Sequence, residues 1–370
     1  MSISKVASID FADIVKVKTI ESGSIYKIGG TAVATVGFTT EWTVAGDATA
    51  RTVTLPLYNT GSFNATIDWG DSTSSLVTTY DDSDRIHEYA SDGTYEVIIT
   101  GACPAWSFTD QPNDDKVKLT DIIHWGTDDV FGGFSYLKEG FYGCSNLKSA
   151  GVGRIGKSGL LGVTTFTWLF LSCTTLDGVP QGLFDLHTEN TSFNGVFYEC
   201  NSLTGIPDDL FKFHRKVGYY GFNASFYNNT SLTAIPDDLF RNNPLVGDGG
   251  FWATFFGCSA IGTVPEGLFR YNTAVTGTHG FEATFQYCSK LQLNSWIFYS
   301  SSEEDTRFFA SPSFENCFYR NSFTGSSGSA PALWDCSFGS GPPVSASCFG
   351  GSGNSTSSLD NYDDIPAGWL

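Results

Sequence analysis

The sequence predicts a mainly β protein in three parts: a short N-terminal segment, a small β-sandwich, and a solenoid with coils of about 29 residues. Two patterns carry this expectation. A motif rich in Phe and Leu recurs at a near-constant interval from residue 141 onward, and four β-like runs separated by turn residues lie between residues 38 and 101. The composition agrees, because 41 Gly residues, many aromatic residues and few charged ones suit short strands and tight turns.

The repeat is clearest in two neighbouring copies. The stretch FYECNSLTGIPDDLF begins at Phe197, and FYNNTSLTAIPDDLF begins at Phe226. One coil cannot bury its Phe and Leu side chains alone, so we expect the coils to stack around one continuous core. Copies begin at Phe141, Phe170, Phe197, Phe226, Phe255, Phe285 and Phe314, at successive intervals of 29, 27, 29, 29, 30 and 29 residues.

One slot of the repeat, three positions after the first Phe, holds Cys in most copies and Asn in one. Both side chains can hydrogen-bond the backbone of a neighbouring loop, so this slot has a structural role rather than a chemical one. We therefore expect a buried ladder of free thiols. Disulfides are the alternative, and the odd total of nine Cys, the Asn substitution and the lack of a signal peptide count against them. The ladder residues are Cys144, Cys173, Cys200, Asn229, Cys258, Cys288 and Cys317.

The repeat pattern, from Phe141 to Leu370, resembles the BspA-like leucine-rich repeats of bacterial surface proteins and of some phage and protist proteins. The resemblance implies a leucine-rich-repeat-type solenoid over residues 141–370 with a degenerate C-terminal cap, to which Trp334 and Trp369 could contribute. The Pro-Asp-Asp-Leu-Phe segments are expected to form single helical turns. Their acidic residues would then align on successive coils, as a solvated face or, alternatively, as a cation-binding ridge; these are Asp208, Asp209, Asp237, Asp238 and Glu266.

The middle of the chain, residues 37–102, reads as a separate β-sandwich. Its stretch from Ile67 to Gly101 resembles a PKD-type immunoglobulin-like domain. Residues 103–140 are expected to form a junction and the first coil. The acidic side chains of the middle domain are interpreted as turn formers, with calcium binding as the alternative, and His87 as a packed residue rather than a catalyst. The matching residues are Trp69-Gly70-Asp71, His87, Tyr89 and Gly93-Thr94-Tyr95, while Ser72 stands where the family usually has Gly.

The first 36 residues fit neither part. They carry apolar residues at spacings of three or near multiples of three, and they are too short to form a core alone. The string resembles the N-terminal segments of tailed-phage virion appendages, which implies docking onto other virion proteins; a disordered or locally packed tail is the alternative. The predicted docking residues are Ile3, Val6, Ile9, Phe11, Ile14, Val17, Ile20, Ile25 and Ile28.

Charge and motifs exclude several functions. A net charge of −19 argues against nucleic-acid binding, and no run of 18 apolar residues exists to insert into a membrane. The five His residues form no metal-binding motif, and no P-loop, nucleophile elbow or dinucleotide fingerprint is present. We expect a protein without enzymatic activity and without a cofactor, with a glycosidase as the remote alternative.

Together these features favour a phage virion appendage, either a head fibre or capsid decoration protein or a tail-associated fibre. Residues 1–36 would bind other virion proteins, and the solenoid would bind a host-surface glycan or protein at the virion surface. The absence of a signal peptide fits assembly in the host cytoplasm. An architectural capsid or tail protein and a cellular surface adhesin are the alternatives, and a dimer or trimer is compatible with all three. Tyr219, Tyr220 and Trp252 are candidate contact residues, with core packing an equal alternative.

Overall fold

The computed structural model describes residues 25–28, 31–34, 37–127, 129–151, 155, 163–299, 307–319, 328–350 and 359–370. The described part of the protein is mainly β with very little helix, as the sequence predicted, and its strands form no barrel. Its strands are β1 (Ile25–Ile28), β2 (Thr31–Ala34), β3 (Phe38–Val44), β4 (Thr52–Thr54), β5 (Asn64–Asp68), β6 (Ser74–Val77), β7 (Ile86–Glu88), β8 (Gly93–Ala102), β9 (Leu119–Trp125), β10 (Arg307–Phe308) and β11 (Ser337–Phe338). The helical elements are α2 (Asn113–Lys116) and four 3-10 turns, η2 (Ser83–Arg85), η3 (Leu333–Asp335), η5 (Tyr362–Asp364) and η6 (Ala367–Trp369).

Residues 37–125, here called the β body, contain a five-stranded antiparallel sheet and a two-stranded one. The large sheet has the order β6-β5-β8-β3-β9, and β4 pairs with β7. Strand β5 alternates exposed and buried residues, so Ala65 and Ile67 face the core. Trp42, Trp69 and Trp106 are fully buried there. Strand β9 comes from the segment expected to be the junction and first coil, yet it pairs with β3 in this sheet.

Strands β1 and β2 pair with each other, from Ile25 opposite Ala34 to Ile28 opposite Thr31. They form a two-stranded sheet of their own and pair with no other strand of the described chain.

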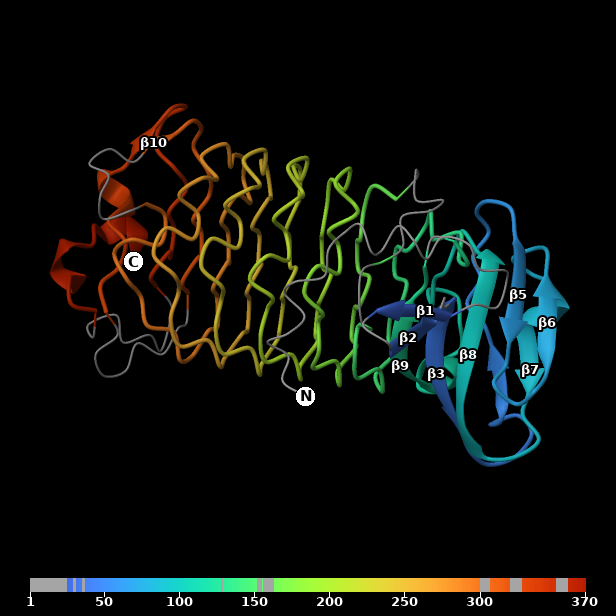
Figure 1. Cartoon of the computed structure of the whole chain (residues 1–370). Helices are drawn as coiled ribbons and strands as arrows, with labels where there is room; N and C mark the ends of the chain where they lie inside the picture. Colours follow the sequence, from blue (N-terminus) through green and yellow to red (C-terminus); the bar gives the residue numbers. More distant parts are fainter. Residues whose placement is uncertain are drawn as a thin grey trace.

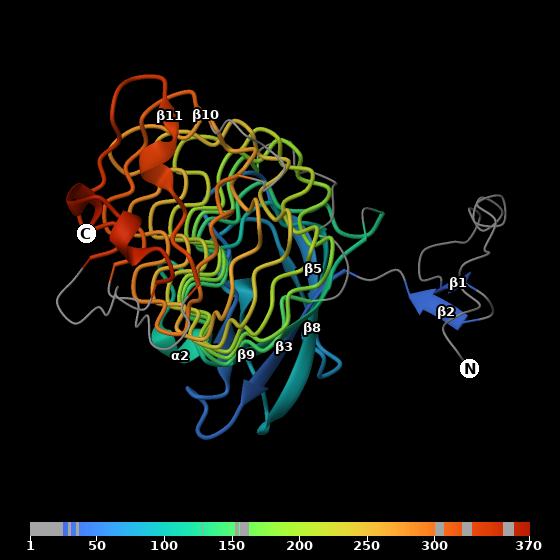
Figure 2. The same cartoon turned by 90° about the vertical axis from the view of Figure 1, so that its left-hand side faces the viewer.

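The described residues between 131 and 349 form successive coils that lie side by side along one axis (Figure 1). This region is here called the repeat stack. Viewed along the axis, its coils lie one behind another (Figure 2). Backbone hydrogen bonds join consecutive coils: the N–H of Phe197 donates to the carbonyl of Ser225 at 2.9 Å, and that of Phe226 donates to Thr254 at 2.9 Å. These bonds satisfy backbone groups that would otherwise be buried without partners.

Three columns of stacked Phe rings form the core of the repeat stack. All their side chains are buried. The rings within a column lie nearly parallel with centroids 5.3–6.2 Å apart, an arrangement favoured by aromatic pairs. The first column is Phe141, Phe170, Phe197, Phe226, Phe255, Phe285, Phe318 and Phe349. The second is Phe166, Phe193, Phe222, Phe251, Phe281 and Phe314, and the third includes Phe211, Phe240, Phe269 and Phe298.

The β body and the repeat stack share one core. The ring of Phe38 on β3 lies 5.7 Å from Trp125 and from Phe131, and Trp125 lies 5.8 Å from Phe141 in the first coil. The indole Nε1 of Trp125 donates to the carbonyl of Ala150 at 2.7 Å. The β body therefore covers the N-terminal end of the stack, as the terminal coil of a stacked array requires.

The C-terminal end of the stack is closed by β10, β11 and the last 3-10 turns. Strands β10 and β11 pair in parallel, and Trp369 packs against Phe314 with ring centroids 5.8 Å apart. Trp334 lies 6.4 Å from both Phe349 and Trp369. Both Trp residues thus occupy the capping position expected of them.

The Pro-Asp-Asp-Leu-Phe segments do not form helices. They are hydrogen-bonded turns, in which the N–H of Leu210 donates to the carbonyl of Pro207 at 3.2 Å. Asp238 has a left-handed backbone with φ of 58°, which a regular helical turn excludes. The expectation of helical turns was wrong because the chain must bend at each corner of the coil.

Candidate functional site

The thiol ladder lies inside the stack and serves the stacking of coils. The Sγ of Cys173, Cys200, Cys258 and Cys288 donates to the carbonyl of Phe141, Phe170, Phe226 and Phe255 at 3.1, 3.2, 2.9 and 3.1 Å. Each acceptor begins the preceding repeat. None of the nine Cys side chains, Cys144 among them, forms a disulfide. The predicted hydrogen bond to a neighbouring backbone is therefore present for four thiols.

Asn229 departs from this pattern. Its side chain occupies the same slot and is fully buried, but neither Nδ2 nor Oδ1 has a hydrogen-bond partner among the described residues. The expectation that Asn would hydrogen-bond the neighbouring coil is wrong here. A buried amide without partners costs free energy of folding.

Cys317 was assigned to the ladder incorrectly. The ring that stacks on Phe285 belongs to Phe318, 33 residues later, and not to Phe314. Cys317 is therefore the residue just before the column member Phe318, and not the third residue after a column member as in the other repeats. Its carbonyl accepts from the N–H of Phe285 at 2.8 Å. In this register the ladder slot falls on Asn321, which lies outside the described residues.

A second polar column was missed from the sequence. It lies three positions after the Leu-Phe pair of each repeat and is occupied by His187, His214, Asn243 and Asn272, all buried. Asn243 donates to the carbonyls of Phe211 and His214 at 3.2 and 2.9 Å, and Asn272 repeats this geometry one coil later. The Nε2 of His214 donates to the carbonyl of Phe184 at 3.0 Å, and burial lowers the pKa of this imidazole.

A third column contains the hydroxyl groups of Ser225, Thr254 and Thr284. Each donates to a Phe carbonyl of the preceding repeat, at 2.9, 2.9 and 3.0 Å.

Burial raises the pKa of Cys103 and of Cys258 to about 12, and it raises the pKa of Cys288 well above its usual value. Such thiols are poor nucleophiles. The raised pKa values of these three thiols fit side chains that pack inside the protein.

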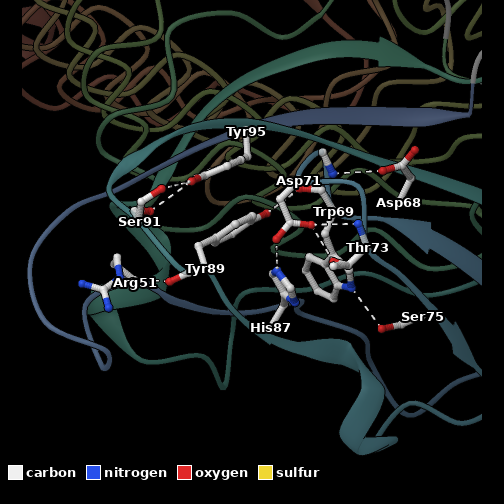
Figure 3. A network of polar contacts seen from close by, with 11 residues as sticks. Arg51, Asp68, Trp69, Asp71, Thr73, Ser75, His87, Tyr89, Ser91 and Tyr95 are labelled. Carbon is white, nitrogen blue, oxygen red and sulfur yellow. Dashed lines mark hydrogen bonds and ion pairs between the residues drawn. The ribbon is translucent and has the colours of Figure 1, made fainter.

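The residues on which the expected PKD resemblance rests form a connected polar network in the β body (Figure 3). The Nε2 of His87 lies 2.8 Å from Oδ2 of Asp71, and its ring stacks on Trp69 with centroids 4.7 Å apart. The hydroxyl of Tyr89 donates to the carbonyl of Trp69 at 2.9 Å. The same Tyr ring stacks on Tyr95 at 3.9 Å. His87 is thus a packed, hydrogen-bonded residue, as predicted.

The acidic residues of this network act as turn formers. Asp68 accepts from the N–H of Gly70 at 2.9 Å, and Asp71 accepts from the N–H of Thr73 at 3.0 Å. Burial works to raise the pKa of Asp71, but the hydrogen bonds from Thr73 and His87 outweigh it and the pKa is lowered. Ser72 adopts a left-handed backbone with φ of 74°, so the turn keeps a conformation that favours glycine.

The predicted acidic alignment is present on two successive coils, without Glu266. Asp208 and Asp209 line the same shallow surface pocket as Asp237 and Asp238. Two of these carboxylates pair with cations of their own coil, Asp209 with Lys212 and Asp238 with Arg241. Throughout the described chain, no group of three or more His, Cys, Asp or Glu side chains is placed to hold a metal ion.

The surface of the stack carries an aromatic row, defined as Tyr219, Tyr220, Trp252 and His279. Ring centroids are 4.5 Å apart for the two Tyr residues, 6.0 Å for Tyr220 and Trp252, and 4.5 Å for Trp252 and His279. Tyr219 is 70% exposed and the other three are partly buried. The three residues predicted as contacts therefore lie together at the surface, and none belongs to the core. His279 was not predicted, although it precedes the Phe281 of its own repeat.

Only part of the predicted docking segment falls in the described chain. Ile25 and Ile28 are the first and last residues of β1. Ile3, Val6, Ile9, Phe11, Ile14, Val17 and Ile20 lie outside the described residues.

Comparison with known proteins gave no relative: no family model, curated protein or solved structure matches the chain. Among the described residues, no helix combines the length and the apolar character needed to span a bilayer.

Proposed function

We propose that the protein is a non-enzymatic appendage of a phage virion, either a head fibre or capsid decoration protein or a tail-associated fibre. Residues 1–36 attach it to other virion proteins. The β body is a PKD/Ig-like sandwich, and the repeat stack is a leucine-rich-repeat-type solenoid of the BspA-like kind. The solenoid presents a surface that adheres to a host-surface or environmental ligand.

The observation that carries the proposal is the aromatic row on a rigid stack. Tyr and Trp side chains are enriched where proteins bind partners, because they combine a large apolar area with a polar group. The stack holds these rings at fixed positions through coil-to-coil hydrogen bonds, such as that from the N–H of Tyr220 to the carbonyl of Asp248 at 3.0 Å. The buried polar columns meanwhile bond to backbone carbonyls of the same stack, which supports a structural rather than a catalytic role for them.

The pairing of β1 with β2 alone supports a separate attachment module. A short hairpin has little core of its own and gains stability from a partner surface. Attachment through this hairpin would leave the outer surface of the repeat stack free to bind a ligand.

Co-sedimentation with phage particles tests the proposal. Particles of a phage that encodes the chain are prepared without it and mixed with the full-length protein or with a variant lacking residues 1–36. We expect the full-length protein to sediment with the particles and the shortened variant to remain in solution. The deletion leaves out no residue of the β body or the repeat stack, because β3, the first strand of the β body, begins at Phe38.

Two outcomes would contradict the proposal. Equal binding by both proteins would place the anchor in the β body or the stack and would favour an architectural capsid or tail protein. Binding by neither, together with recovery of the protein from envelopes of uninfected cells, would indicate a cellular adhesin.

A further inference from the structure

The aromatic row combines ring surfaces with hydrogen-bonding groups at one end. The Nδ1 of His279 lies 2.6 Å from Oε2 of Glu282. Glu282 also lies beside Trp252, on the next coil. The residue after Trp252, Ala253, donates its backbone N–H to the carbonyl of Glu282 at 2.9 Å. The site therefore offers apolar ring area beside a carboxylate and an imidazole, both partly exposed.

We propose that this row binds a neutral polysaccharide chain that lies along the axis of the stack. The proposal rests on the adhesive role proposed above and specifies its ligand class. A sugar ring has apolar C–H faces, which pack on aromatic rings, and hydroxyl groups at its edges, which hydrogen-bond to carboxylate and imidazole. The row crosses three consecutive coils, whose even spacing suits a ligand that is itself a repeating chain.

The backbone of the following coil holds the row in place. Gly249 has a left-handed φ of 62°, and a Cβ at this position would meet the Tyr220 ring at 2.8–3.0 Å. A Cβ at Gly277 would similarly collide with the carboxylate of Asp248. Glycine at these two positions lets the side chains of one coil lie flat against the next. Ring positions fixed in this way reduce the ordering cost of binding.

The charge of the protein selects against anionic glycans. The chain has a net charge of −19, and the carboxylates of Asp248 and Glu282 flank the row. A uronic acid or sialic acid would meet like charge at this surface. Sugar hydroxyls, in contrast, donate well to carboxylates. The ligand is therefore neutral.

A second line of aromatic residues on the stack does not offer the same surface. Tyr198, Tyr227 and Phe256 stack face to face, with centroids 4.4 and 4.5 Å apart and rings within 3° of parallel. The ring faces that meet in this line cover one another and are closed to a ligand. Tyr219, at the end of the aromatic row, meets Tyr220 at an angle of 62° and is 70% exposed.

Affinity electrophoresis of the full-length protein tests the proposal. Gels contain galactomannan or mixed-linkage β-glucan as neutral probes, and hyaluronate as the acidic probe. The variants are Tyr219→Ala, Trp252→Ala and Tyr219→Phe, and Phe309→Ala is the matched control because Phe309 is an exposed aromatic residue (74%) outside the row. We expect a neutral polysaccharide to retard the wild type. Tyr219→Ala and Trp252→Ala should weaken the apparent affinity about tenfold. Tyr219→Phe keeps the ring and should weaken the affinity less than Tyr219→Ala, and Phe309→Ala should leave it unchanged.

Three results would overturn the proposal. They are retardation in hyaluronate alone, equal retardation of Tyr219→Ala and Phe309→Ala, and no retardation in either neutral gel. Circular dichroism of each variant separates loss of binding from loss of folding. Co-sedimentation keeps the two proposals apart: a protein that docks on particles but is not retarded retains the appendage role and lacks the polysaccharide site. Retardation without docking supports the site and contradicts the virion anchor.

Discussion

Replacing Asn229 by Cys should stabilise the protein. The buried Nδ2 and Oδ1 of Asn229 have no partner among the described residues, whereas a thiol in this slot donates to the Phe carbonyl of the preceding repeat. The acceptor here would be the carbonyl of Phe197. An unsatisfied buried polar group costs about 1–3 kcal/mol, and Cys is close to Asn in size, so no large cavity forms. We therefore expect Asn229→Cys to raise the free energy of unfolding by about 1–3 kcal/mol.

Asn243→Cys provides the matched control. The Nδ2 of Asn243 donates to the carbonyls of Phe211 and His214, whereas its Oδ1 has no partner among the described residues. Loss of the donor to two buried carbonyls outweighs the removal of this one oxygen, so the free energy of unfolding should fall by about 1 kcal/mol. Urea unfolding in reductant, followed by Trp fluorescence, measures both variants. Hydrogen exchange of the coils that begin at Phe197 and Phe226 reports the change locally, because each coil contacts only its neighbours. A lower midpoint for Asn229→Cys, or shifts of the same sign in both variants, would refute the reasoning.

Two further predictions concern titration and the β body. Burial raises the pKa of seven thiols, whereas unfolded thiols ionise near 9.0. The contribution of the protonated thiols to the free energy of unfolding is thus fully present below pH 9. Above pH 9 the free energy of unfolding should fall by about 1.4 kcal/mol per thiol for each pH unit. Urea midpoints between pH 8 and 10 measure this fall, and a flat profile would contradict the burial of the thiols. Asp71→Ala should lower the free energy of unfolding by about 1–2 kcal/mol, because Thr73 and His87 lose their acceptor. The exposed Asp84→Ala is its control in the same urea assay, and equal effects of the two changes would show that the network contributes nothing.

The stacking of the repeats and most of its register could be predicted from the sequence, because a constant period forces equivalent residues into columns. The period failed at the last copy. The segment before Phe314 is longer than in earlier repeats. The ring that stacks on Phe285 is therefore that of Phe318, four residues after the Phe314 that the constant period selects. Both positions are Phe and both are buried in columns, so residue type alone could not distinguish them.

The second polar column escaped prediction for a different reason. His187, His214, Asn243 and Asn272 share a spacing of 27 or 29 residues but not a residue type. A search for repeated letters therefore misses them, whereas a search for repeated hydrogen-bond donors at a fixed distance after Leu-Phe would find them. The aromatic row was predicted in part, because Tyr219, Tyr220 and Trp252 stand out by type, but their exposure depends on the corner geometry of each coil. The glycine at position 249 that makes room for Tyr220 becomes visible only when two coils are stacked.

The interchange of residue types in the polar columns has one physical cause. Thiol, hydroxyl, amide and imidazole groups all donate a hydrogen bond, and in the stack they point at a Phe carbonyl of the preceding coil. Stacked Phe rings supply apolar burial without fixing which ring lies above which, since every member of a column is alike. A buried donor, in contrast, reaches its carbonyl on the preceding coil only when the two coils are aligned in one particular way. The buried polar groups thus set the alignment of the coils, and the side chains on the outside of the stack are left free for the recognition proposed above.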